Sequence, residues 1–201
     1  MEIFEETVET LEVDEIIETG KKEKKKTTFK DEAIDFLKTF VIVAVVAFLV
    51  RTFVFNFADV EGNSMEPTLQ HGDRLLVWQL FYQPSLFDVV IIEHDGGELH
   101  VKRILGTPGD RVDYINGEMV INGEVINEEY VFDTLSLNGF VLEQICQFDD
   151  CDVIPEDYFL VLGDNRNGSG DSRVYGLIHR EQILGRNILR ISPLSNFGSF
   201  D

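Results

Sequence analysis

The stretch VEGNSMEPTL, residues 60–69, follows an apolar run and precedes a strand-rich region, and the chain is organised around it. Gly62 permits a backbone turn that a side chain would resist. Pro67 fixes its own φ and pushes Glu66 toward an extended conformation, so a helix cannot continue smoothly through Ser64. The stretch therefore predicts a serine on a short irregular segment, where its hydroxyl and its N–H can both face a substrate. The simpler interpretation is that Ser64 only caps a turn.

Length and charge limit the classes of protein to which this chain can belong. Its 201 residues suffice for one domain with appendages. The net charge of −20 argues against a general nucleic-acid binder, which needs a basic surface. Residues 1–32 contain an acidic run and then a lysine cluster, with too little apolar surface to fold alone. We interpret them as a solvated tail, although the spacing of a few apolar residues also allows an acidic amphipathic helix for a partner.

An apolar segment of membrane length follows this tail. It covers residues 34–57 and is uninterrupted between residues 40 and 50. A helix needs about 20 apolar residues to span a bilayer, so we predict one transmembrane anchor over residues 33–55. The lysines on its N-terminal side place residues 1–32 in the cytoplasm by the positive-inside rule. The competing interpretation, a cleavable signal peptide, would need a shorter N-terminal region and a small-x-small pair after the apolar run.

Residues 56–201 then form an extracytoplasmic domain whose serine segment lies close to the membrane surface. The linker between Arg51 and Ser64 reaches at most about 40 Å, even when fully extended. Three residues at this position are suited to the membrane interface: Phe53, Phe55 and Phe57. We therefore expect the protein to contact membrane lipid.

The remainder of the chain has the pattern of a mainly β protein. Runs typical of strands occur at residues 74–78, 88–92, 100–105, 158–162 and 188–191. Two Asn-Gly pairs, at 116–117 and 122–123, each lie between strand-like runs and predict tight hairpins. No segment after the anchor has a long helical period. We predict a barrel-like β domain over residues 56–201, in which residues 111–158 form a β-hairpin subdomain.

The cysteine and histidine residues do not indicate a metal site. Cys146 and Cys151 are the only cysteines, and the four histidines lack metal-ligand spacing. A short disulfide and two free thiols are both compatible with the sequence, because the redox compartment decides between them. We predict neither a metal nor a cofactor.

One lysine is set apart because the other basic residues after the anchor are all arginine. Lys102 is the single lysine after Lys38, and it lies in a strand-like run with apolar neighbours. Arginine does not give up its proton in proteins, whereas a buried lysine can. Lys102 is thus a candidate general base, although a strand lysine that points to solvent fits the same spacing.

The segment LGDNRNGSGDSR, residues 162–173, directly follows a predicted strand and is dense in glycine, acids, arginine and small hydroxyls. Such a loop can supply hydrogen bonds that orient another group, and Asp171 and Arg173 are close enough in sequence to form an ion pair. The alternatives are an ordinary polar loop and a calcium site, but an EF-hand loop requires a glutamate that this segment lacks.

Three motifs occur in order behind one N-terminal anchor: SMEPTL at residues 64–69, KRILGTPGD at residues 102–110, and GDNR through SGDSR at residues 163–173. Together they resemble the bacterial type I signal peptidases, most of all the single-anchor form of Gram-positive bacteria, over residues 36–192. The resemblance implies a signal-peptidase-like β-barrel domain. It also implies a membrane-bound serine endopeptidase, without a cofactor, that removes signal peptides from exported precursors.

The resemblance implies roles for individual residues as well. Ser64 matches the nucleophile, and its backbone N–H matches an oxyanion donor. Lys102 matches the general base, which must be uncharged to take the serine proton, and burial among apolar groups lowers the pKa of a lysine. The supporting residues that match are Arg103 beside the base, Ser169 whose hydroxyl holds the lysine, the ion pair of Asp171 and Arg173, and Asp164.

Two positions depart from the family pattern. Some members have a serine two residues before the nucleophile as a second oxyanion donor, where this chain has Gly62. The strand motif that often begins Gly-Asp reads Phe87-Asp88 here. We expect the substrate to bind extended along a β-edge, with small side chains before the cut. Whether secretion machinery contacts the protein is left open by the sequence.

Two other functions are compatible with parts of this pattern. A self-cleaving, repressor-type Ser/Lys peptidase resembles this chain in its serine and lysine, but it carries a DNA-binding domain where this chain has a lysine-flanked anchor. A catalytically inactive, membrane-tethered binding module would keep the fold without the chemistry. The presence of both Ser64 and Lys102 argues against that module.

Overall fold

The computed structural model describes residues 29–94, 96–131, 139–149 and 151–199. The tail predicted at residues 1–32 lies outside the described residues, except for the positions that begin the first helix. This helix, α2, spans Phe29–Phe53 and contains the apolar stretch Glu32–Thr52. At about 1.5 Å per residue, the stretch is roughly as long as a bilayer's hydrocarbon core is thick. An N-terminal apolar helix is thus present where the sequence predicts the anchor.

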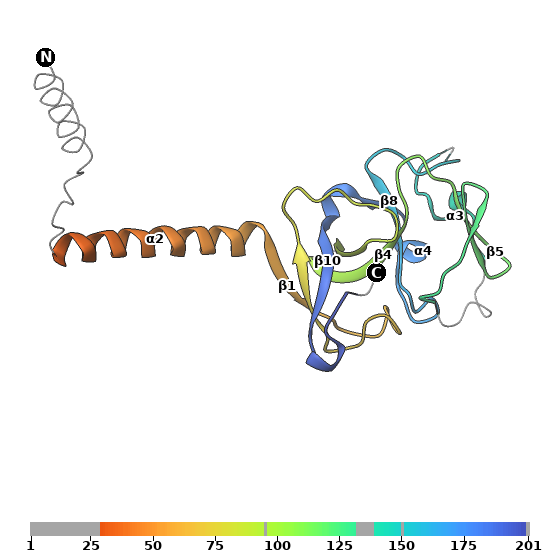
Figure 1. Cartoon of the computed structure of the whole chain (residues 1–201). Coiled ribbons are helices and arrows are strands. Elements are labelled where there is room, and N and C mark those ends of the chain that lie inside the picture. The colour runs from red at the N-terminus through yellow and green to blue at the C-terminus, as the bar shows by residue number, and fades with distance from the viewer. Residues whose placement is uncertain (1–28, 95, 132–138, 150, 200–201) are drawn as a thin grey trace, which may run out of the picture. The chain divides into compact units, whose positions relative to one another are not determined.

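A seven-stranded sheet forms the larger part of the domain that follows α2 (Figure 1). Its strand order is β1-β2-β10-β3-β4-β8-β9, and all of its strand pairs are antiparallel. The bounds are β1 Phe55–Asp59, β2 Arg74–Trp78, β3 Val89–His94, β4 Glu98–Gly106, β8 Tyr158–Leu162, β9 Ile178–His179 and β10 Ile183–Ser192. β1 is an edge strand of this sheet, so one of its two sides is not paired with another described strand.

A second, three-stranded sheet lies on the opposite side of the domain from β1 (Figure 1). Its strands are β5 Val112–Ile115, β6 Glu118–Ile121 and β7 Glu124–Ile126. Both Asn-Gly pairs form its turns, with φ of 54° and 87° at the first pair and 53° and 85° at the second. Positive φ at both central residues matches the right-handed twist of the flanking strands. The two predicted hairpins are therefore confirmed.

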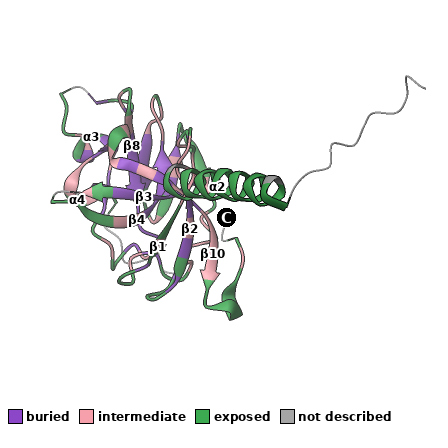
Figure 2. Ribbon diagram, turned by 90° about the vertical axis from the view of Figure 1, so that its left-hand side faces the viewer, coloured by how far each residue is buried: buried purple, intermediate pink, exposed green. Residues whose placement is uncertain are grey.

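Apolar side chains from the two sheets pack into a shared core. Leu105 of β4 and Leu160 of β8 pack with Val112 of β5 and Met119 of β6, and all four are fully buried. Figure 2 shows the buried residues concentrated on the central strands of the large sheet. Burial of apolar surface in this one core therefore stabilises both sheets together.

Strand β1 is the main difference from the sequence-based prediction. The sequence interpretation assigns Phe55 to the anchor and Phe57 to the membrane interface, whereas the structure pairs Phe55–Asp59 with β2. The ring of Phe55 packs edge-on against Trp78, with 5.2 Å between ring centroids, while Phe57 remains about half exposed. The sequence of Phe55–Asp59 does not by itself indicate a strand, because the strand with which it pairs, β2, lies about 20 residues later.

The remaining elements are short. They are the single-turn helices α3 Leu142–Ile145 and α4 Ser172–Tyr175 and the 3₁₀ turns η1 Arg180–Gln182 and η2 Leu194–Asn196. A disulfide joins Cys146 to Cys151, which answers the question that the sequence leaves open. Between these cysteines, the side-chain amide of Gln147 donates to the carbonyl of Leu177 at 3.1 Å and accepts from its N–H at 2.9 Å. The disulfide loop is thereby attached to the segment that follows α4.

Substitution of Gly106 by alanine tests the close contact between the two sheets. A Cβ at this position would lie 2.7 Å from Val112 Cγ2 and would overlap with Ile154. We expect Gly106→Ala to lower the free energy of unfolding by about 1–3 kcal/mol, as overpacked cores do. The measurement is thermal unfolding of the detergent-solubilised chain. Gly170→Ala is the control because its Cβ would meet no atom within 4 Å; equal melting temperatures for both variants would contradict this packing.

Candidate active site

Ser64 lies on the irregular segment between β1 and β2, and Lys102 lies within β4. Lys102 Nζ is 2.9 Å from Ser64 Oγ, which is hydrogen-bond distance. Gly62 has a φ of +82°, so the predicted turn before the serine is confirmed. The structure therefore brings together the two residues that the sequence analysis expects to carry the chemistry.

Hydrogen bonds connect the two ends of the serine segment, residues 60–73. Val60 N–H donates to the carbonyl of Asp73 at 2.8 Å, and Gly72 N–H donates to the carbonyl of Val60 at 2.9 Å. The buried carboxylate of Asp73 accepts from Gln70 N–H and from Arg190 Nη1, both at 3.0 Å. The segment is irregular, but these bonds give it one defined conformation.

Burial determines the chemistry of Lys102. Its side chain is 1% exposed, and on β4 it is paired with Val90 of β3. The pKa of Lys102 is lowered from its ordinary value, chiefly because burial disfavours the ammonium form, while the charges of Asp171 and Asp164 partly oppose the shift. A lysine with a lowered pKa can accept a proton at a pH where an exposed lysine cannot.

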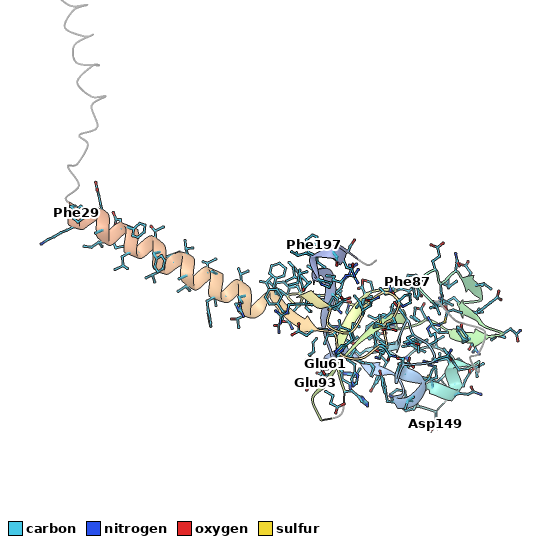
Figure 3. The ribbon with its side chains drawn as sticks, turned by 90° about the horizontal axis from the view of Figure 1, so that it is seen from below. Phe29, Glu61, Phe87, Glu93, Asp149 and Phe197 are labelled. Carbon is cyan, nitrogen blue, oxygen red and sulfur yellow. A yellow bond between two sulfur atoms is a disulfide. The ribbon has the colours of Figure 1, made fainter. Side chains whose placement is uncertain are left out.

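Asp164, in the loop after β8, links this loop to β4 and to the serine segment. Arg103 donates to both of its carboxylate oxygens, at 2.9 Å from Nε and 2.8 Å from Nη2, and Thr68 Oγ1 donates at 2.6 Å. Arg103 Nη1 also donates to the carbonyl of Phe87, at 3.1 Å, and Figure 3 labels Phe87. Arg103 and Asp164 are thus ion-paired and almost fully buried, and Thr68 is a third member that the sequence analysis missed.

The predicted ion pair of Asp171 and Arg173 is formed. Arg173 Nε and Nη2 each lie 2.7 Å from a different carboxylate oxygen of Asp171. The same carboxylate accepts from the N–H of Gly163 at 3.0 Å, so it holds the two ends of the loop together. The loop in turn contacts the serine segment, because Asn165 N–H donates to the carbonyl of Ser64 at 3.1 Å.

Ser169 is near the site but does not bond to the lysine. Its hydroxyl lies 3.5 Å from the carbonyl oxygen of Gly170, and no hydrogen bond joins it to Lys102 among the described residues. It is nevertheless close to the serine segment, because Gly163 leaves no room for a Cβ between Ser169 Oγ and the carbonyl oxygen of Ser64. Ser169 would have to change its hydrogen bonding before it could hold the lysine.

The backbone N–H groups near Ser64 differ in their availability. No hydrogen bond connects the Ser64 N–H to another described residue, so this donor can serve a bound substrate. The N–H of Gly62, in contrast, donates to His71 Nδ1 at 3.2 Å. Gly62 has no hydroxyl, and its N–H is already hydrogen-bonded to His71. Gly62 therefore does not supply a second oxyanion donor in this structure.

A groove of about 680 Å³ leads to Ser64. One wall comes from β1 and the residues that follow it, among them Glu61, which Figure 3 labels. The other wall comes from residues 98–101 of β4. Within the described strands, this half of β4 pairs with β3 only, because β8 pairs with β4 from Arg103 onward. Two strands with unpaired edges thus line the groove.

Two further contacts near the site have no local sequence signal. Arg166 donates to both carboxylate oxygens of Glu128, which lies 38 positions earlier in the chain, and both side chains are almost fully buried. Asn165 reaches the backbone of Ser64 across about 100 positions. The motif at residues 163–166 contains Asn165 and Arg166, but a motif does not name their partners.

Among the described residues, no group of three or more His, Cys, Asp or Glu side chains is placed to hold a metal ion.

A buried amine beside a serine hydroxyl, in a groove lined by open strand edges, is an arrangement that suits a serine hydrolase. Comparison with known proteins agrees with this class. The family described as signal peptidase, peptidase S26, matches residues 33–192. Signal peptidase IB of Staphylococcus aureus is 33% identical over 179 residues, which cover 84% of this chain and 94% of that protein.

Two further proteins are similar to this chain. A probable signal peptidase I-2 of Synechocystis sp. is 32% identical over 194 residues, covering 90% of this chain and 82% of that protein. The crystal structure of a signal peptidase I from Enterococcus faecalis matches with 30% identity and a TM-score of 0.47, covering 52% of this chain and 97% of the other. The chain belongs to the signal peptidase family, peptidase S26, and is a serine endopeptidase of the signal peptidase I type. The predicted family is confirmed.

Removal of the Asp164 charge tests how far the site depends on its buried ion pair. Asp164→Asn leaves the Arg103 guanidinium buried without a counter-charge, and we expect a loss of about 3–5 kcal/mol in the free energy of unfolding. Urea denaturation of the detergent-solubilised chain measures it. The control is Asp59→Asn, since Asp59 and Arg74 form an equally bidentate pair in solvent, where water screens the interaction. A similar loss in both variants would contradict the assignment.

Proposed function

We propose that this signal peptidase cleaves its substrates with Ser64 as the nucleophile and Lys102 as the general base. The observation that carries the proposal is the 2.9 Å separation between the buried amine and the serine hydroxyl. Burial keeps a fraction of the amine uncharged, and only an uncharged amine can take the serine proton. Asp164, Arg103, Asp171 and Arg173 act in this proposal by holding the loop and β4 in place, and Ser169 by holding the lysine once a substrate is bound.

The reaction then proceeds through a covalent intermediate. Lys102 Nζ takes the proton from Ser64 Oγ as this oxygen attacks the scissile carbonyl, and the Ser64 N–H stabilises the oxyanion. The lysine ammonium gives its proton to the leaving amine, and the C–N bond breaks to leave an acyl-serine. Water attacks the ester and transfers a proton to Lys102. Collapse of the second oxyanion breaks the bond to Ser64 Oγ, which takes the proton back from Lys102. The signal peptide is then released with a free carboxyl group at its C-terminus.

The groove suits a substrate in extended conformation. An unbound peptide strand can pair with the open edges of β1 and of residues 98–101 in β4, which gives backbone hydrogen bonds without regard to sequence. Ser64 lines the same groove, so a peptide bound there passes the nucleophile. The signal peptide of an exported precursor is the substrate that we propose, with small side chains before the cut.

The proposed location follows from the apolar helix. In this proposal α2 spans the cell membrane once, with residues 1–32 in the cytoplasm and the catalytic domain on the outer face, where it contacts lipid. The support is the lysine cluster before the helix, as well as the length of the apolar stretch. This topology would present the groove to precursors as they leave the secretion machinery.

Substitution of the two central residues tests the proposed chemistry. We expect Ser64→Ala, Lys102→Ala and Lys102→Arg each to lower kcat by about 10²- to 10⁴-fold. The first variant lacks the nucleophile, the second lacks the base, and the third has an arginine that cannot release its proton. The assay follows cleavage of a peptide with an Ala-x-Ala site by the detergent-solubilised chain. Lys38→Arg, a lysine substitution in the helix, is the control and should leave kcat unchanged. Robust activity in Lys102→Arg would show that another group is the base.

The pH dependence of the same reaction tests the state of the amine. Below the lowered pKa of Lys102 the amine is protonated and cannot act as a base, so kcat/KM should fall as the pH decreases through that value. His100 lines the groove and has a lowered pKa of its own, mainly from burial. His100→Asn is therefore measured in parallel and should keep the acidic limb in place. A rate independent of pH from mildly acidic to mildly alkaline conditions would be incompatible with Lys102 as the base.

A further inference from the structure

A buried ion pair connects the second sheet to the loop of the active site. Glu128 follows β7, and Arg166 lies in the loop after β8. Arg166 Nη1 donates to Glu128 Oε2 at 3.0 Å and Nη2 donates to Oε1, and the two side chains are 1% and 5% exposed. A bidentate pair that is removed from water holds its two backbones in one relative position.

Arg166 passes this constraint on to the nucleophile. Its Nε donates to the carbonyl oxygen of Gly163 at 3.1 Å, which closes the first turn of the loop. Gly163 packs directly against the carbonyl oxygen of Ser64, where there is no space even for a Cβ. Asn165, between these two loop residues, donates its N–H to the same Ser64 carbonyl at 3.1 Å. The backbone of Ser64 thus rests on the part of the loop that Arg166 fixes.

The same segment also reaches the residue beside the base. Tyr130 donates its hydroxyl to Glu128 Oε1 at 3.0 Å. The guanidinium carbon of Arg103 lies 4.1 Å from the centre of the Tyr130 ring, within the range of a cation–π contact. Arg103 follows Lys102 on β4. Tyr130 is therefore connected to Lys102 through Arg103, and Glu128 is connected to Ser64 through Arg166 and Gly163.

We propose that Glu128 is a positioning residue for the cleavage reaction. Through Arg166 it fixes the loop against which Ser64 rests, and with Tyr130 it supports Arg103, so the second sheet sets the alignment of Ser64 Oγ with Lys102 Nζ. The inference rests on the proposed roles of Ser64 and Lys102. It assigns a catalytic consequence to a region that contributes none of the described residues lining the groove.

A positioning role has a specific kinetic signature. A displacement of about 1 Å in a reacting atom lowers the rate by as much as about 10²-fold. Substrate binding should be unaffected, because the walls of the groove come from β1 and from residues 98–101, which Glu128 does not contact through any of its hydrogen bonds to described residues. Loss of Glu128 should therefore lower kcat and leave KM unchanged.

The test compares two adjacent glutamates in the full, detergent-solubilised chain with an Ala-x-Ala peptide as substrate. We expect Glu128→Gln to lower kcat by about 10- to 100-fold, with KM within about twofold of the original value. Glu129→Gln is the matched control, because Glu129 is exposed and bonds only to Asn127 among the described side chains. It should leave both constants unchanged. An unchanged kcat in Glu128→Gln, or a change in KM alone, would overturn the proposal.

A double substitution tests whether Glu128 acts through Arg166. In an Arg166→Gln background the route through Arg166 is already broken and only the contact with Tyr130 remains, so Glu128→Gln should lower kcat by a smaller factor than it does in the original chain. Additive losses would contradict the proposed path. If Glu128→Gln does not fold, Arg166→Lys decides, because lysine keeps a positive charge beside Glu128 but cannot form the bidentate pair or the bond to Gly163 through a guanidinium. A lower kcat with unchanged KM supports the proposal, and an unchanged kcat overturns it.

The outcome for Ser64→Ala separates this inference from the proposed function. If Ser64→Ala is inactive and Glu128→Gln equals the original chain, only the positioning role fails. If Ser64→Ala remains active, the assignment of the nucleophile fails, and the role of Glu128 fails with it.

Discussion

The structure of this site depends on the removal of one lysine amine from water. Transfer of an ammonium group into a protein interior is unfavourable, and the chain accommodates Lys102 by favouring its uncharged form. Two buried carboxylates, those of Asp164 and Asp171, lie close enough to oppose this shift. Each of them has its own arginine, Arg103 and Arg173, at bidentate distance. The arginines therefore limit the charge that these carboxylates present to the amine.

The topology of the sheet explains how distant segments meet at the amine. Ser64 and Lys102 are 38 positions apart, Arg103 and Asp164 are 61 apart, and Thr68 and Asp164 are 96 apart. β4 occupies an inner position in the sheet, paired with β3 along most of its length and with β8 at its C-terminal half. This arrangement buries the second half of β4, which carries Lys102, and leaves an open edge along the first half, which lines the groove. One strand thus provides both the proposed base and one wall of the groove.

Much of this arrangement could be predicted from the sequence, for identifiable reasons. The Asn-Gly turns and the apolar alternation of β2 are local signals, so the strands around them were predictable. Lys102 could be singled out because arginine replaces lysine everywhere else after the anchor. β1 was not predicted, since an aromatic run next to a membrane helix has the composition of a membrane interface. The partnership of Glu128 with Arg166 could not be predicted either, because only the packing of the second sheet on the first brings them together. Ser169 shows that a matched motif position does not specify a hydrogen bond.

The most direct test of the account is a measurement of the lysine's own ionisation. Lys102 is the single lysine after Lys38, and the NMR signal of its side chain in a ¹³C-lysine-labelled sample can be assigned by comparison with Lys102→Met. A titration of that signal should give a pKa below the ordinary lysine value of 10.5, because the amine is buried. A pKa at or above 10.5 would mean that the amine is charged in the working enzyme, and it would contradict the central claim.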